Sequence, residues 1–260
     1  MDAWTDQQKD EHVQCPKCHQ PRQAQRPDCP HCGIYFSKYA QFLERQAAAA
    51  QAVIDGTADN ESGVSRLWRY LLTPPDAGSG LWYGRAALWV LFVLWGGHFI
   101  LQDIPSLAAA PSFLHNVDLV FHEAGHVLFG VFGSFIGSLG GSLGQLLMPL
   151  ICAIALLRQR DTFGASLCLW WVGQNCLDIA PYMADARAGQ LPLLGGNFGH
   201  SAPYGFHDWE YLLSETGLLA HDQGLALLCL NLGRLLMLLG LIWAGYLLWR
   251  SRPQLSHATD

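Results

Sequence analysis

Two groups of metal-ligating residues stand out in this 260-residue sequence. One group is His122-Glu123-Ala124-Gly125-His126, which lies in an otherwise apolar segment. Histidines four residues apart lie on one face of a helix and can bind one metal ion, and the glutamate can take a proton from metal-bound water. Zinc lowers the pKa of such a water to about 7. We therefore predict a catalytic zinc with His122 and His126 as ligands and Glu123 as general base.

The other group is Cys15, Cys18, Cys29 and Cys32, spaced as Cys-x2-Cys, a ten-residue loop and Cys-x2-Cys. Each pair can present two thiolates from a tight turn, and two such turns complete a tetrahedral zinc site. A module of this size has almost no hydrophobic core, so metal binding supplies its folding energy. We predict a structural zinc here.

A catalytic zinc takes three protein ligands and keeps one position open. The third apolar stretch (163–184) and the residues just after it contain a polar stripe that recurs at steps of three and four residues, which comprises Gln174, Asn175, Asp178, Tyr182 and Asp185. A carboxylate at mid-membrane costs about 2.5–3.5 kcal/mol on insertion scales, so such residues have functional partners. We expect Asp178 to be the third ligand, and His207 and Asp208 are its rivals for that position or for contact with substrate.

Three further features surround the HExxH segment. Asp118 lies one helical turn before His122 and is expected to orient it. Asn175 can bind a substrate backbone or bridge two helices. The glycines between 133 and 144 favour either close helix packing or an irregular turn that pairs with an extended substrate. If there is no metal, the histidines hydrogen-bond between helices and Glu123 is solvated at the membrane interface.

The elements that position these residues follow from composition. The chain is 51% hydrophobic and 14% charged, whereas a soluble domain has about 25% charged residues. Residues 1–85 are polar and most of residues 86–250 are apolar, which predicts one small soluble module and one membrane domain. We assign residues 1–40 to a zinc-ribbon, 41–84 to a helical linker with an interfacial helix at 64–72, 85–250 to a transmembrane metal-site domain, and 251–260 to a cytosolic tail.

The predicted fold class is an all-α polytopic membrane domain of about four spans, with a re-entrant or half-depth HExxH helix. The apolar stretches are 85–102, a broken region at 116–157, 163–184 and 223–249. Their flanking arginines place both termini in the cytosol and the 185–222 loop outside, with Arg187 as the exception. No signal peptide is expected at the N-terminus.

The HEAGH segment, followed in a later span by Asn-x-x-Asp before Pro181, resembles the site-2 protease family of intramembrane zinc metalloproteases over residues 116–182. In that family, two histidines and an aspartate of a later transmembrane helix bind zinc, and the glutamate is the general base. The resemblance implies His122, His126 and Asp178 as ligands and Glu123 as base. Asn175 is similar to the asparagine that helps to hold substrate in that family.

The segment CPKC…CPHCGIYFSKY is similar to small zinc-ribbons fused to many bacterial membrane proteins. This implies an integral protein of a bacterial inner membrane whose ribbon docks a cytosolic protein. The first 45 residues have equal numbers of acidic and basic side chains, which argues against nucleic-acid binding. The predicted function is zinc-dependent hydrolysis of a membrane-associated peptide or helix. The alternatives are a metal-dependent membrane hydrolase of a lipid or amide, and a metal-binding scaffold or sensor without enzymatic activity.

Overall fold

The computed structural model describes residues 14–21, 26–54, 63–75, 79–110, 112–194 and 196–253. The chain divides into two compact units, Met1–Ser65 and Arg66–Asp260. Within the described ranges every regular element is a helix, and extended residues pair only in isolated bridges. The boundary between the units lies inside the segment 41–84 that we expected to be a linker. Most of the expected cytosolic tail lies outside the described residues.

The first unit contains two cysteine turns followed by α1 (Phe36–Ile54). The two turns share one backbone hydrogen bond, from the first cysteine to the residue five positions later. Cys15 N–H donates to Gln20 O over 2.8 Å, and Cys29 N–H donates to Ile34 O over 2.9 Å. Phe36, the first residue of α1, packs against the cysteines. The helix therefore begins directly on the metal-binding turns.

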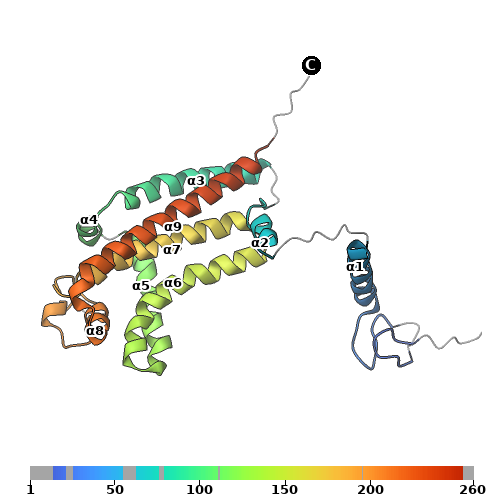
Figure 1. Cartoon of the computed structure of the whole chain (residues 1–260), viewed down its shortest axis with the longest axis horizontal. Coiled ribbons are helices and arrows are strands. Elements are labelled where there is room, and N and C mark those ends of the chain that lie inside the picture. The colour runs from blue at the N-terminus through green and yellow to red at the C-terminus, as the bar shows by residue number, and fades with distance from the viewer. Residues whose placement is uncertain are drawn as a thin grey trace, which may run out of the picture. The chain divides into compact units, whose positions relative to one another are not determined.

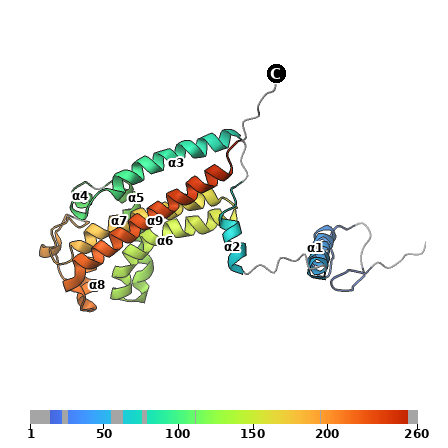
Figure 2. The ribbon, with the colours of Figure 1, turned by 45° about the horizontal axis from the view of Figure 1, so that its top comes forward.

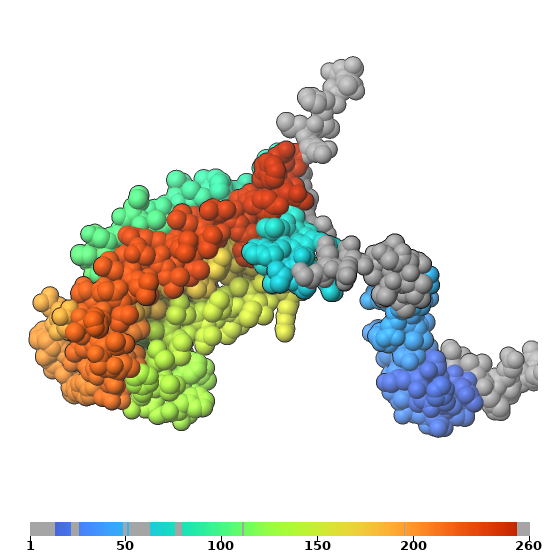
Figure 3. Space-filling view, viewed as in Figure 1, coloured from blue at the N-terminus to red at the C-terminus, as the bar shows by residue number. Residues whose placement is uncertain are grey.

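The second unit is a helical bundle built around α7 (Thr162–Ala184), most of whose residues are buried. α7 packs against α9 (Asp222–Arg250), α6 (Ser134–Arg158), α3 (Ser79–Ile100) and α4 (Ile104–Ala109). In the space-filling view α9 crosses this face of the unit in front of α7 (Figure 3). The other elements are α2 (Gly63–Leu71), α5 (Phe113–Phe129), η1 (Gly130–Phe132), η2 (Gly199–Ser201), α8 (Asp208–Glu215) and η3 (Leu219–His221).

Small residues allow α7 and α9 to touch along their backbones. A Cβ added at Gly173 would lie 2.5 Å from Gly233 O, and one at Gly240 would lie 2.9 Å from Trp170 N. Close approach through glycine is typical of helices that pack in membranes. The contact holds α7, and with it the polar stripe, in the centre of the bundle.

Helices α5 and α6 form a hairpin beside the α7–α9 pair (Figure 1 and Figure 2). A Cβ at Gly125 would lie 2.0 Å from Gly140 O, and a Cβ at Gly144 would lie 2.3 Å from Phe121 O. The chain turns at Gly133, where φ is +100°, and then continues as the helix α6 from Ser134. Of the glycines between 133 and 144, Gly133 therefore forms the turn of the hairpin, while Gly140 and Gly144 lie within α6 and allow close packing against α5.

Two of the described helical segments are long and apolar enough to cross a membrane, α6 and Leu219–Arg250. Four spans are therefore not supported. The polar residues Gln174, Asn175 and Asp178 lower the mean hydropathy of α7, and Arg85 and His98 lower that of α3. α7 is surrounded by other helices, so its polar stripe faces protein and a cavity.

The predicted interfacial helix is present as α2, and the chain after it is fixed to the second unit. Trp243 Nε1–H donates to Leu71 O over 2.8 Å, and the Thr162 hydroxyl donates to Thr73 O over 2.8 Å. The position of α2 at a membrane interface stays a prediction.

Candidate metal centres

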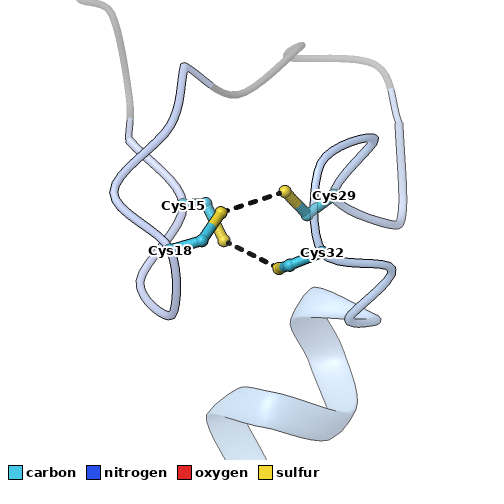
Figure 4. Close-up of side chains that lie close together, drawn as sticks. All are labelled: Cys15, Cys18, Cys29 and Cys32. Atoms are coloured by element: carbon cyan, nitrogen blue, oxygen red, sulfur yellow. Dashed lines mark hydrogen bonds between the residues drawn. The ribbon is translucent and has the colours of Figure 1, made fainter.

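The four cysteines of the first unit point at one another from two turns (Figure 4). Cys15 Sγ lies 3.8 Å from Cys32 Sγ, and Cys18 Sγ lies 3.6 Å from Cys29 Sγ. Four sulfurs about 2.3 Å from a tetrahedral zinc would be about 3.8 Å apart. The arrangement therefore fits a structural zinc.

The residue after each Cys-x-x-Cys pair has a left-handed backbone. His19 has φ 59° and Gly33 has φ 69°. The shared conformation follows from the turn, so His19 occupies a backbone position that glycine favours. Its role in the first unit is that of a turn residue, and the four thiolates already complete the donor set.

In the second unit, α5 presents both histidines of the HExxH segment to α6. His122 Nδ1 lies 2.7 Å from Gln145 Oε1, and His126 Nδ1 lies 2.8 Å from Gly137 O. Because both partners are carbonyl oxygens, each imidazole donates its Nδ1–H to α6. Each Nε2 then has a lone pair for a metal, which is the usual arrangement of histidine ligands.

Both Nε2 atoms converge on the carboxylate of Asp208, the first residue of α8. Asp208 Oδ2 lies 3.2 Å from His122 Nε2 and 3.3 Å from His126 Nε2. Nitrogen and oxygen ligands about 2.0–2.2 Å from a tetrahedral zinc would be about 3.4 Å apart. Burial alone would raise the pKa of Asp208. The contacts of its carboxylate with His122 and His126 have the larger combined effect, and the pKa lies below its ordinary value.

The hydrogen-bond pattern favours a cation between these groups. Each Nδ1 is bound to a carbonyl oxygen of α6, and both Nε2 atoms face the same carboxylate oxygen, Asp208 Oδ2. The two ring centroids are only 4.7 Å apart. One divalent ion would accept both Nε2 lone pairs and would balance the carboxylates of Glu123 and Asp208.

Gly141 on α6 leaves space at the point where the ligands meet. A Cβ at this position would lie 2.4 Å from His122 Nε2 and 2.6 Å from His126 Nε2. Any side chain other than hydrogen would therefore fill the region that faces both ligand atoms. The residue at position 141 has to be glycine if this region is to hold an ion.

The centre opens into a cavity of about 750 Å³. Glu123 lines this cavity, and one of its carboxylate oxygens lies within 4.8 Å of the histidine ligand atoms. A general base needs access to the water that it deprotonates, so this position is suitable. The site therefore combines three convergent ligand atoms, an adjacent carboxylate and room for a substrate.

Tyr182 of α7 holds Asp208 in place. Asp208 N–H donates to the Tyr182 hydroxyl over 3.0 Å, and that hydroxyl donates to Asp208 Oδ2 over 3.2 Å. His207 stacks on the Tyr182 ring with centroids 4.3 Å apart. These contacts explain how a residue from a long loop reaches the HExxH helix.

Asp178, our expected third ligand, is placed elsewhere. Its Oδ1 and Oδ2 lie 2.9 and 3.1 Å from His115 Nδ1. His115 precedes His122 by seven residues, which is about 10.5 Å along a helix. A carboxylate held at His115 therefore does not reach the HExxH nitrogens, and the carboxylate that contacts both histidines is that of Asp208.

His207, the other rival, is fully buried and does not point at the metal centre. Its Nδ1 accepts from Glu210 N–H over 3.2 Å and so caps α8, and its Nε2 lies 3.5 Å from Asp185 Oδ2. Burial lowers the pKa of His207. His207 is therefore a structural residue that holds the start of α8.

Asp118 and Asn175 do not have the contacts that were expected of them. Asp118 Oδ1 accepts from Trp171 Nε1–H over 2.9 Å, and within the described residues Asp118 forms no hydrogen bond with His122. Asn175 Oδ1 accepts from Gln145 Nε2–H over 3.2 Å. Asn175 is fully buried, so it orients the glutamine that orients His122 and does not face substrate.

Sequence reasoning missed the functional positions of three residues. Tyr182 is expected above only as a member of the polar stripe, and nothing is expected there of Gln145 or His115. The spacing of seven residues between His115 and His122 places both on one face of a helix, and this was the available indication. For Gln145 and Tyr182 the contacts join separate helices, so no local pattern identifies them.

Comparison of the chain with protein-family models, curated proteins and solved structures gives no match. A functional interpretation therefore depends on the chemistry of the residues at these two centres and on their geometry.

Proposed function

We propose that this protein is a membrane-embedded zinc metallopeptidase that hydrolyses an amide bond in a membrane-associated peptide or helix. The main support is the convergence of His122 Nε2, His126 Nε2 and Asp208 Oδ2 at the wall of a large cavity. Three protein ligands with one open position are the composition of a catalytic zinc site. When bound, zinc would lower the pKa of a water molecule and polarise the substrate carbonyl.

The residues around the ligands have separate tasks. Glu123 takes the proton of the attacking water and delivers it to the leaving amine, because it lines the cavity next to the histidines. Gln145 and Gly137 O hold the imidazole rings, and Tyr182 holds the Asp208 carboxylate. Rigid placement of this kind reduces the reorganisation needed during reaction.

The surface of α5 supports a location in the membrane. Val120, Val127 and Leu128 are 65, 79 and 67% exposed on this helix, and α6 next to it is long and apolar enough to cross a bilayer. Contact with lipid would cover these side chains. We further propose that the first unit is a cytosolic docking module, because its four cysteines fit a structural zinc and offer no open ligand position.

The experiment is zinc analysis and hydrolysis by the purified full-length chain in detergent. Wild type should hold about two zinc ions per chain, His126→Ala about one, and Glu123→Gln about two. Wild type, and neither variant, should cleave detergent-solubilised membrane proteins and fluorescein-labelled casein. New peptide termini should incorporate ¹⁸O from labelled water, because a water oxygen enters the product carboxylate.

The same assay separates the rival functions. Release of fatty acid from phospholipid vesicles without peptide cleavage would show a lipid hydrolase with the same metal centre. A Glu123→Gln variant that retains the cellular phenotype of the wild type would instead support a metal-binding scaffold. One zinc per chain in both wild type and His126→Ala would contradict the second metal centre altogether.

A further inference from the structure

A second polar group faces the cavity away from the metal centre. His115 of α5 and Asp178 of α7 both line it, with side chains 38 and 15% exposed. They contact each other over 2.9 Å between Nδ1 and Oδ1. The proposed hydrolysis uses neither residue.

The position of this pair relative to the metal centre is set by α5. His115, Leu119, His122, Glu123 and His126 all line the cavity, so they form one stripe of the helix. Seven residues separate His115 from His122, and this corresponds to about 10.5 Å along the helix axis. An extended peptide covers about 3.3–3.6 Å per residue, so the two polar groups are about three peptide residues apart.

The pair has defined hydrogen-bonding chemistry. Asp178 accepts the Nδ1–H of His115. The other ring nitrogen, Nε2, has no hydrogen-bond partner among the described residues. The Asp178 carboxylate, at hydrogen-bond distance from the ring, favours the protonated form of the imidazole. His115 Nε2 is then a charged N–H donor.

We propose that the His115–Asp178 pair is a substrate-binding subsite, in which His115 Nε2–H donates to a carbonyl or terminal carboxylate oxygen of the peptide. The oxygen would lie about three residues from the hydrolysed bond. This inference rests on the proposed peptidase function and adds to it the register of the substrate. Asp178 is a positioning residue, because it fixes the proton on Nδ1 and the orientation of the ring.

The test is peptide binding to the full-length chain with the Glu123→Gln substitution, which prevents turnover. The probes are a short fluorescein-labelled peptide of alternating alanine and leucine with a free carboxylate, and the same peptide with a C-terminal amide. His115→Phe should weaken binding about 10- to 100-fold, as expected for one charge-assisted hydrogen bond. His115→Gln, which retains an N–H donor, should restore part of the affinity.

The matched control is His98→Phe, because His98 has a Gln102 side-chain partner at 2.8 Å and does not line the cavity. Its affinity should equal that of the parent. Weakening of the carboxylate probe alone would identify a terminal carboxylate as the bound group, and equal weakening of both probes would identify a backbone carbonyl.

Two results would overturn the subsite: unchanged binding of both probes by His115→Phe, or binding of neither probe by the parent. Zinc content and thermal unfolding of each variant are measured in parallel. A wild-type protein that binds the probes through His115 but hydrolyses no peptide would contradict the peptidase function and leave the subsite standing.

Discussion

Substitution of Gly141 by alanine tests the metal centre most directly. The new Cβ would lie 2.4 Å from His122 Nε2 and 2.6 Å from His126 Nε2, whereas a zinc–nitrogen bond is about 2.0–2.1 Å long. The methyl group and the ion would compete for nearly the same space. Either the rings rotate away or the ion is excluded, and both outcomes destroy the ligand geometry.

The expected loss of zinc affinity at this centre is at least about 100-fold, since removal of one outer hydrogen-bond partner alone typically costs 10–100-fold. A 100-fold loss corresponds to about 2.7 kcal/mol. Alanine is favoured over glycine in a helix by about 1 kcal/mol, so the helix itself should persist. After dialysis against a chelator of matched affinity, the zinc content should fall from about two ions per chain to about one.

Two controls separate metal exclusion from general disruption. Gly97→Ala on α3 has no atom within 4 Å of the new Cβ and should retain both ions. Gly144→Ala places its Cβ 2.3 Å from Phe121 O and should lower the thermal stability of the second unit by separating α5 from α6. If Gly141→Ala binds both ions as tightly as wild type, the ligand atoms do not meet where the structure places them.

Three further changes have separate expected outcomes. Gln145→Leu should weaken zinc at the second centre about 10–100-fold in competition with a chromophoric chelator, while Gln145→Glu, which keeps an acceptor for His122, should not. Cys15→Ser should remove the ribbon zinc and unfold residues 15–33, and the unfolding temperature of the second unit should stay unchanged; joint loss of both units would contradict their independence. Arg187→Met should lower the thermal unfolding midpoint of the second unit, because the Asp222 side chain is only 1% exposed and loses both its contacts with Arg187, of 2.8 and 2.6 Å, keeping only the N–H of Gln223. An unchanged midpoint would show that water replaces the guanidinium.

Local spacing predicted the parts of the molecule that depend on a few neighbouring residues. The cysteine pairs and the HExxH histidines are brought together by one turn or one helical face, so their sequence alone indicates a ligand group. The polar stripe of α7 was also correctly expected to lie near the site, since Gln174, Asp178 and Tyr182 all line the cavity.

The third ligand could not be chosen from the sequence because the decision is made by tertiary contacts. Asp178 and Asp208 are both acidic residues near polar segments, and Asp208 is 86 residues from His122. Tyr182 selects Asp208 by bonding to its backbone and its carboxylate, and His115 occupies Asp178. Four spans are not supported for a different reason: Gln174, Asn175 and Asp178 lower the mean hydropathy of α7, and Arg85 and His98 lower that of α3.

The ligands of the second centre come from two separate segments of the chain. The two nitrogen ligands and both oxygen atoms that hold them belong to the α5–α6 hairpin, whereas the carboxylate belongs to the start of α8. A bound ion would therefore act as a cross-link between the hairpin and the loop that leads into α8. By mass action, zinc at about 100 times its dissociation constant would favour the closed arrangement by about 2.7 kcal/mol. The concentration of free zinc would then set two properties: the occupancy of the metal site, and the stability of the contact between α8 and the α5–α6 hairpin.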